Sequence, residues 1–186
     1  MINKNKYGCL PLYGENSIVD RAHYGGRLKR NYVSKEHERA IGFIGSAEMV
    51  DVYPRPVKFM VDEERVKDLH ITEGTVLLSR SGTIGNVSFC NKTLSDFLVS
   101  EHAMRLECND FSGYVYTFLK TKIGKKLVCS NIYGAVIQQI EPEHLSTVPI
   151  PNAPNEIKER IHDLILKSYE LRDESNELID QATALL

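Results

Sequence analysis

The chain has 186 residues, of which 42% are hydrophobic and 26% charged, a composition typical of a globular protein with one well-formed core. It contains neither the run of ~20 apolar residues that a membrane-spanning helix needs nor the apolar stretch of a signal peptide, so we expect no membrane contact and a cytoplasmic location. The net charge of −2 is uneven: residues 1–60 hold ten Lys and Arg against six Asp and Glu (+4), and residues 151–186 hold four against eight (−4), which places any contact with a polyanion near the front of the chain.

The first 150 residues are predicted to form a β-rich domain of short strands separated by turns. Each predicted strand is rich in β-branched and aromatic residues, and glycine or asparagine punctuates the sequence between them. The predicted strands are Ile41–Ile44, Val57–Val61, Thr75–Ser79, Asn86–Cys90, Phe97–Val99, Ala103–Leu106 and Val136–Ile140. Two short helices are expected at Glu63–Leu69 and Tyr114–Lys122, the second with Gly124 as its C-terminal stop.

Residues 74–87 form the most distinctive local string, Gly-Thr-Val-Leu-Leu-Ser-Arg-Ser-Gly-Thr-Ile-Gly-Asn-Val. It is predicted to be a buried strand, a polar turn in which Gly82 and Gly85 permit positive φ, and a second strand. The hydroxyls of Ser81 and Thr83 and the guanidinium of Arg80 suit phosphate oxygens or base edges. A plain hairpin with a solvated arginine explains the same residues equally well.

The sequence period changes after Pro149, Pro151 and Pro154, which exclude a continuous helix across this stretch. Beyond them, apolar and small residues recur at alternating intervals of four and three positions. These residues, which we call the seam, are Ile157, Ile161, Leu164, Ser168, Leu171, Ser175, Leu178, Ala182 and Leu185. So narrow a stripe is typical of a coiled-coil helix, here ~42 Å long. Residues 151–186 are therefore predicted to be a helix whose partner lies outside this chain, with docking on the chain's own domain as the alternative.

The seam also favours one orientation of its partner. In a parallel pair each seam residue would meet its own copy, so that Ser168, Ser175 and Ala182 would leave thin layers. In an antiparallel pair whose facing residue numbers sum to 339, Leu164 meets Ser175 and Ala182 meets Ile157, and each small residue faces a large one. An antiparallel homodimer, or pairing with the equivalent helix of a longer subunit, is therefore expected.

The turn string resembles a motif in the target-recognition domains of DNA-specificity (S) subunits of type I restriction-modification systems. Further stretches are similar to that family in order and spacing, over roughly residues 20–186. They are Gly26–Val33 with Phe43–Ser46, Val99–Leu106, Ser130–Ile137, Leu145–Pro151 and Tyr169–Leu178. The resemblance implies an α+β protein: a target-recognition domain over residues 1–150, followed by a conserved helix over residues 151–186 for dimerisation or subunit association.

The same resemblance implies a division of labour. The chain would read one half of a bipartite duplex DNA target, a separate modification subunit would methylate adenine, and a separate restriction subunit would cut. The chain itself would need no cofactor. Full-length S subunits carry two recognition domains and two helices, whereas this chain has one of each; a half-length subunit, a fragment of a longer gene and an excised domain all fit.

Candidate DNA-contacting residues fall into four groups. The first group is a basic entry segment beside an aromatic residue, which suits phosphate or guanine contacts. The second is the turn string, with hydroxyls and a guanidinium. The third is a later stretch with stacking and amide groups, and the fourth is a run of lysines suited to phosphate contacts. In that order the groups are Arg27, Lys29, Arg30 and Tyr32; Arg80, Ser81 and Thr83; Tyr133, Gln138 and Gln139; and Lys120, Lys122, Lys125 and Lys126. An ordinary polar surface is the alternative for each.

No catalytic site is predicted. The sequence lacks the glycine-rich cofactor loop of a methyltransferase and the phosphate-binding loop of an ATPase. Glu101 and His102 are not expected to act together as a general-base pair, because neighbours on a strand point to opposite faces. Neither the histidines nor the four cysteines have metal-ligand spacing, so no metal site is expected. Two other functions stay open: a protein-interaction adaptor that docks through its helix, and a recognition module split from a fused restriction-modification enzyme.

Overall fold

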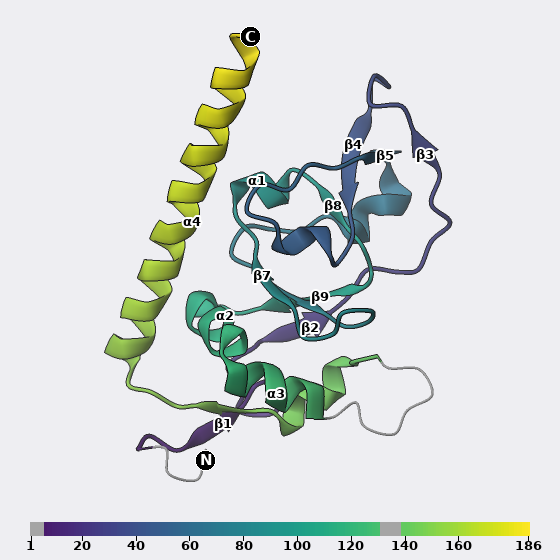
Figure 1. Ribbon diagram of the computed structural model, residues 1–186. Coiled ribbons are helices and arrows are strands. Elements are labelled where there is room, and N and C mark those ends of the chain that lie inside the picture. Colours follow the sequence, from purple (N-terminus) through teal and green to yellow (C-terminus); the bar gives the residue numbers. More distant parts are fainter. Residues whose placement is uncertain (1–5, 131–138) are drawn as a thin grey trace.

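The computed structural model describes residues 6–130 and 139–186. A central sheet lies between helices α2 and α3 on one side and a second, smaller sheet on the other, and helix α4 runs along one flank of this arrangement (Figure 1). The layers follow from strands that are apolar on both faces and must be covered twice.

The central sheet is antiparallel, in the order β2 (Arg21–His23), β9 (Ala103–Glu107), β6 (Val76–Ser79) and β7 (Val87–Phe89). Its central strand β6 is buried at every position. Because side chains alternate across a strand, Val76 and Leu78 enter the core beneath α2, and Leu77 enters the core toward the second sheet. This double burial explains the continuous apolar run in the sequence.

The second sheet has the order β3 (Tyr32–Val33), β5 (Lys58–Val61), β4 (Ala40–Ile44) and β8 (Leu98–Val99). β4 and β8 are parallel, and the other pairs are antiparallel. The 3-10 helix η3 (Glu64–Leu69) covers this sheet, while the short helices η2 (Glu48–Val50) and α1 (Lys92–Ser95) supply Met49 and Leu94 to the core between the two sheets.

On the other side of the central sheet lie α2 (Ser112–Lys120), α3 (Lys122–Ser130) and the 3-10 helix η4 (Pro142–Thr147). A two-stranded antiparallel sheet of β1 (Cys9–Pro11) and β10 (Pro149–Pro151) closes this layer, with Cys9 opposite Pro151. The first described strand therefore lies beside the residues that lead into α4 (Figure 1).

Helix α4 (Asn155–Ala184) docks on α2 through Ile161, Ile165 and Tyr169, which we call the proximal contact. Tyr169 is 5% exposed, and its hydroxyl donates to the Tyr116 hydroxyl at 2.9 Å. The two helices approach closely at Gly113, where an added Cβ would lie 2.8 Å from the His162 Cα. The Gly113 N–H donates to His162 Nδ1 at 3.0 Å.

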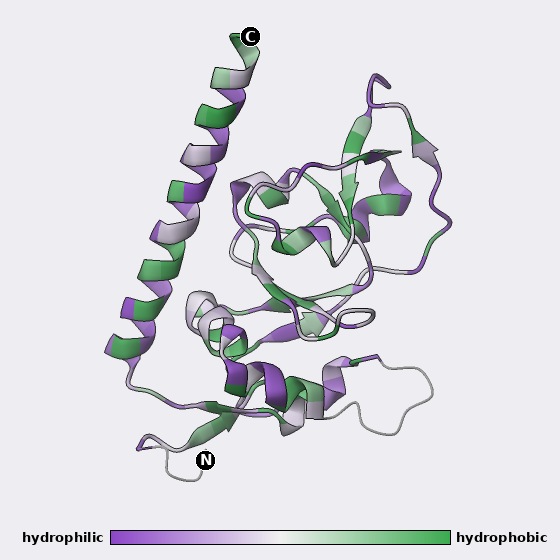
Figure 2. Ribbon diagram, in the orientation of Figure 1, coloured by the Kyte–Doolittle hydropathy of each residue, from purple (hydrophilic) through white to green (hydrophobic). Residues whose placement is uncertain are grey.

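Apart from Ile161, which belongs to both, the seam lies on a different side of α4 from the proximal contact and is largely open to solvent. Leu164, Leu171 and Leu178 are 63%, 53% and 57% exposed, whereas Ile161 is partly buried in the proximal contact. Apolar residues recur along α4 well beyond its neighbourhood with α2 (Figure 2). The helix thus docks on its own domain, as the alternative interpretation had it, and still presents the seam for a partner. Among residues 6–130 and 139–186, none of the helices combines the length and apolar character needed to cross a membrane.

The α+β class is confirmed, and the predicted strands between residues 41 and 106 correspond to β4 through β9. The short strands β1, β2, β3 and β10 were not predicted. Two helix predictions were wrong in detail: residues 64–69 form a 3-10 helix, and Gly124 does not end α2 but lies within α3. A Cβ at Gly124 would lie 2.2 Å from the Phe118 carbonyl oxygen, so the glycine permits α3 to approach the end of α2. Residues 136–138 of the last predicted strand lie outside the described residues, and the division at residue 150 stays a prediction.

Candidate nucleic-acid interface

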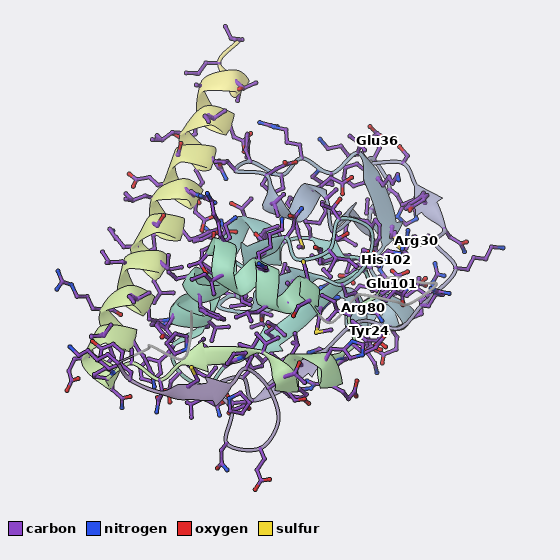
Figure 3. The ribbon with its side chains drawn as sticks, turned by 60° about the horizontal axis from the view of Figure 1, so that its bottom comes forward. Tyr24, Arg30, Glu36, Arg80, Glu101 and His102 are labelled. Carbon is purple, nitrogen blue, oxygen red and sulfur yellow. The ribbon has the colours of Figure 1, made fainter. Side chains whose placement is uncertain are left out.

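Polar side chains from distant parts of the sequence gather on one face of the domain. Viewed from the side that carries η4 and β1, the labelled side chains of Arg30, Glu101, His102, Arg80 and Tyr24 follow one another along this face (Figure 3). Hydrogen bonds, ion pairs and a cation–π contact connect them, directly or through the backbone. We call the connected set the polar network; its members are Tyr24, Arg30, Arg80, Ser81, Glu101, His102 and Glu141.

The loop of residues 100–102, between β8 and β9, lies at the middle of the polar network. The buried side chain of Arg105 holds this loop in place. This arginine is 2% exposed. Its guanidinium donates to the carbonyl oxygens of Val99 (2.5 Å), Ala103 (2.6 Å), Ser100 (3.0 Å) and Leu69 (3.3 Å). Burial lowers the pKa of Arg105 to about 10, so it is charged at neutral pH. Four carbonyl dipoles directed at one buried cation fix the loop that presents Glu101 and His102.

Arg30 and Glu101 form the first ion pair of the network. Arg30 Nη2 lies 2.8 Å from both carboxylate oxygens of Glu101, and the guanidinium carbon is 5.0 Å from the centre of the Phe43 ring. Burial is the largest single influence and would raise the pKa of Glu101, but the hydrogen bonds from Arg30 and from the backbone, together with the positive charge of Arg30, hold the pKa below its usual value. Because 31% of the Arg30 side chain is exposed against 10% of Glu101, the cation faces outward and the anion is beneath it.

Arg80 is enclosed rather than solvated. Only 6% of its side chain is exposed. Nε donates to the Ile140 carbonyl at 3.1 Å, Nη2 pairs with Glu141, and the Tyr24 ring centre is 3.8 Å from the guanidinium carbon. The Tyr24 hydroxyl also donates to Glu141 at 2.8 Å, and this hydrogen bond raises the pKa of Tyr24. Arg80 therefore joins the turn after β6 to residues 140–141.

The turn between β6 and β7 has the conformation that its glycines predict. Gly82 and Gly85 have φ of 70° and 80°, values that favour glycine. The Ser79 hydroxyl donates to the Thr83 carbonyl at 2.5 Å and accepts from the Asn86 N–H at 2.9 Å. This bracing leaves Thr83 exposed at the tip, while the nearly buried Ser81 contacts His102, with Oγ 2.6 Å from Nδ1.

The remaining predicted residues lie at various places around the network. Arg27 and Lys29 are exposed on the segment before β3, and Tyr32 is 44% exposed with Lys58 Nζ 5.6 Å from its ring centre. Lys122 is exposed on α3. Lys125, also exposed, reaches the turn, where Nζ donates to Asn86 Oδ1 at 3.1 Å. Lys120 Nζ donates to the Val87 carbonyl at 3.4 Å, and Lys126 is exposed.

Of the candidates in the later stretch, only Gln139 is among the described residues. Tyr133 and Gln138 lie outside the described residues. Gln139 is described, and its Oε1 accepts from Arg80 Nη2 at 3.4 Å. The last of the predicted amide groups is thus next to the network.

The prediction that Glu101 and His102 are neighbours on a strand was wrong. The two residues lie in a turn and not in a strand, so they are not forced to opposite faces. His102 Nε2 and Glu101 Oε1 are 3.6 Å apart. Since Glu101 is already paired with Arg30, the turn adds His102 to the polar network. Within the described ranges, no group of three or more His, Cys, Asp or Glu side chains could hold a metal ion.

Sequence reasoning missed Tyr24, Glu141, Lys58 and Arg105. Glu141 is 61 residues from Arg80, so no local spacing joins them. For Arg105 a signal was present: it stands between apolar residues in the predicted strand Ala103–Leu106, where alternation places it on the same face as Ala103. A charged residue at a position of that kind needs hydrogen-bond partners.

Comparisons with known proteins agree with this arrangement. Residues 44–182 match a family model described as the type I restriction modification DNA specificity domain. No curated protein sequence matches the chain.

Three solved structures are similar in fold. One is a chain from a structure of the type I R-M system concerned with its complex assembly and conformational transition (TM-score 0.59, 16% identity, 90% of this chain and 40% of that chain). The others are the HsdS subunit from Thermoanaerobacter tengcongensis (0.53, 18%, 86% and 37%) and the type I S subunit from M. genitalium (0.50, 16%, 83% and 40%). The chain thus spans about 40% of the length of the structures it matches.

Proposed function

Because the chain belongs to the type I restriction-modification DNA specificity family, we propose that it recognises one half of a bipartite duplex DNA target. The observation that carries the proposal is the convergence of the segments around residues 24–32, 80–83 and 100–102 on one face (Figure 3). These segments include the basic entry segment and the turn string that were predicted from the sequence. The two are far apart in the sequence, and the fold brings them to the same face.

The residues of this face divide by exposure. Arg27, Lys29, Tyr32 and Thr83 are exposed and can reach a duplex directly, with the cations suited to phosphates and the aromatic ring to stacking or sugar contact. Lys122 and Lys125 extend the basic character onto α3. Arg30 is half covered by its ion pair with Glu101 and keeps an exposed side.

For Arg80 and Ser81 the structure favours a supporting role. The Arg80 guanidinium is enclosed by Tyr24, Glu141 and the Ile140 carbonyl. Ser81 is directed at His102. Direct contact of either residue with DNA stays a prediction, as it does for Tyr133 and Gln138.

The exposed seam supports association through α4. We infer an antiparallel pair, formed with a second copy of this chain or with the equivalent helix of a longer subunit. The side chains of Leu164, Leu171, Leu178 and Leu185 are 63%, 53%, 57% and 88% exposed, whereas apolar side chains of this size gain roughly 1.5–3 kcal/mol each on full burial. A ~42 Å rod would place two recognition domains at its ends, a separation suited to half-sites about one DNA turn (~34–36 Å) apart.

The partners follow from the family. We propose that a modification subunit supplies adenine methylation and a restriction subunit supplies cleavage, so that this chain contributes recognition and assembly in the cytoplasm. The matched family model is a specificity domain and not a catalytic one.

A salt titration tests the DNA interface. The protein is titrated into a fluorescent mixed-sequence duplex between about 50 and 200 mM salt, the range over which phosphate contacts lose most affinity. Each phosphate contact should contribute about −0.9 to the slope of log K against log salt. Arg27→Ala combined with Lys29→Ala should reduce the slope. Lys167→Ala, which removes an exposed cation on α4, is the matched control and should leave it unchanged.

A flat slope, or no binding at all, would contradict the DNA interface. It would favour the adaptor hypothesis instead, for which the exposed seam is the supporting observation.

Cysteine cross-linking tests the antiparallel pair. Position 161 is partly buried against α2, so the exposed pair at 164 and 175, whose numbers also sum to 339, is the better choice. After replacement of the accessible native cysteines, a mixture of the 164 and 175 single-cysteine proteins should form a mixed disulfide under mild oxidation. Cross-linking of 164 only to its own copy, or a strict monomer in light scattering, would rule the arrangement out.

A further inference from the structure

A second region of α4 touches the domain through polar side chains. Four residues, Asp173, Asn176, Glu177 and Asp180, face residues 52–55 and 91–93, and we call this set of interactions the distal contact. The four positions follow the spacing of one helix face, and at ~100° per residue they lie on the opposite side of α4 from Leu171, Ser175 and Leu178 of the seam. The distal contact and a seam partner therefore occupy different sides of the same helix.

Asp173 makes the densest interactions of the distal contact. Its Oδ1 accepts from Asn91 Nδ2 at 2.7 Å, from the Thr93 N–H at 3.0 Å and from Thr93 Oγ1 at 2.5 Å. Hydrogen bonds to a charged acceptor are short and directional, so this carboxylate fixes the position of α1 against α4.

The other three residues tie α4 to both neighbouring segments. Asn176 is 3% exposed, and its Nδ2 donates to the Val52 carbonyl at 3.3 Å. Glu177 pairs with Lys92 at 2.8 Å and Asp180 with Arg55 at 3.0 Å. These two ion pairs are more than half exposed and each contributes little to stability.

The interactions that make up the distal contact are hydrogen bonds and ion pairs. A cavity of about 430 Å³ lies between α4 and the second sheet, and its lining includes Tyr53, Arg55, Lys92, Thr93, Asn176 and Asp180. The proximal contact, in comparison, buries Tyr169 against Tyr116 and Phe89. The apolar packing of the proximal contact thus holds α4 on the domain. The directional hydrogen bonds of the distal contact fix the angle between α4 and the domain.

We propose that the distal contact is a specificity-determining element: it fixes the angle of the recognition domain on α4 and so sets the length of unread DNA that a paired assembly accepts between its half-sites. This inference rests on the proposed function. Without the distal contact the domain can turn about the proximal contact. One base pair adds ~3.4 Å to the length of a duplex, and one full turn spans ~34–36 Å. A rotation that moves the DNA-facing side of the domain by a few ångström therefore changes the accepted spacer by one base pair.

The double variant Asp173→Ala/Asn176→Ala tests the proposal. It removes the two most engaged side chains of the distal contact and leaves the seam and the polar network unchanged. Glu174→Ala/Gln181→Ala is the matched control, because it also removes one carboxylate and one amide from α4, both at exposed positions.

The first measurement needs no DNA. Spin labels are placed at positions 57 and 160, both exposed, in protein whose accessible native cysteines are replaced, and labelled chains are diluted with unlabelled ones. We expect one narrow distance distribution for the parent protein and the control, and a distribution at least twofold broader for the double variant. Equal widths in all three proteins would overturn the proposal, whatever the protein does with DNA.

The second measurement selects duplexes from a random-sequence library with the full chain and reads the recovered sites by sequencing. The parent protein and the control should enrich two half-site motifs at a single spacing. The double variant should enrich the same motifs at two or more spacings that differ by one or two base pairs. An unchanged single spacing, loss of the half-site motif in the double variant, or a half-site motif that the parent protein enriches only unpaired would overturn the role in spacing; absence of any enriched motif with the parent protein would overturn the proposed function and this inference with it.

Discussion

Replacement of Tyr169 by phenylalanine tests how α4 is held on its domain. The Tyr169 and Tyr116 hydroxyls are 2.9 Å apart and buried, and burial together with this hydrogen bond raises the pKa of Tyr116 well above its usual value. The substitution leaves the rings in place, with Tyr169 5.2 Å from Phe89 and 5.7 Å from Tyr116. It removes one hydrogen bond and leaves the Tyr116 hydroxyl buried without that partner.

The expected loss follows from those two terms. A neutral hydrogen bond contributes ~0.5–1.5 kcal/mol net, and a buried hydroxyl left without its partner costs ~1–3 kcal/mol. The free energy of unfolding should therefore fall by about 1–2 kcal/mol in Tyr169→Phe and by a similar amount in Tyr116→Phe. The double variant should lose less than the sum, by ~1 kcal/mol, because two apolar groups of the same shape then face each other.

Urea unfolding measures these values. The chain has no tryptophan, so far-ultraviolet circular dichroism is the suitable signal, at one fixed protein concentration because a paired helix makes stability concentration-dependent. Tyr13→Phe, which changes a tyrosine packed at the edge of the core, is the control and should lose less than about 0.5 kcal/mol. Additive losses in the double variant, or a Tyr169→Phe protein as stable as the parent, would refute the view that the two hydroxyls act as one unit.

Two further predictions use urea unfolding, and a third uses DNA binding. Gly113→Ala should destabilise the protein by roughly 1–3 kcal/mol, because the new Cβ would lie 2.8 Å from the His162 Cα; a neutral result in urea unfolding would contradict the close helix approach. Glu101→Gln should make the free energy of unfolding less sensitive to acid. Arg30 helps to hold the pKa of Glu101 below its usual value. A carboxyl whose pKa is lowered by folding stabilises the protein above its unfolded-state pKa of ~4.3, and this stabilisation is lost as the pH falls through the folded-state pKa. The urea midpoint of the variant should then fall less than that of the parent between about pH 5 and pH 3. Lys125→Ala should weaken binding to all DNA sequences alike and reduce the salt slope by about 1, and a change of sequence preference in a binding selection would show that this lysine reads bases.

The strands between residues 40 and 107 were predictable from the sequence because their signal is local. Val76–Leu78 is a continuous apolar run that ends at a glycine-containing turn, and the structure has β6 and its turn there. The seam was predictable for the same reason, since a repeat of four and three positions is visible without any knowledge of the fold.

The docked side of α4 was not predictable, because its residues carry no common chemical character. Tyr169, Asp173 and Asn176 lie on one face, yet they include one aromatic, one acid and one amide. Their partners are 53 to 124 residues away in sequence. Arg80 shows the same limit: its sequence neighbours suggest an exposed cation, and only the fold brings Glu141 and Tyr24 around it. Polar interactions between residues this far apart in the sequence leave no periodic pattern. The sequence therefore indicates candidate functional residues but not which of them already have partners within the fold.

The strand pairings of the domain are nested, and this has a consequence for folding. β4 pairs with β8, β2 with β9 outside that, and β1 with β10 outside both. Loop-closure entropy favours the shortest closure first, so the pairings should assemble from the innermost outward, with the β1–β10 pair last. Most of the chain must then leave the ribosome before β1 and β2 find their partners β10 and β9, as is typical of slow, non-local topologies. Because β10 leads directly into α4, the nascent helix emerges with its apolar seam while the domain beside it is still folding. The risk of aggregation is therefore greatest in the interval between synthesis and helix pairing.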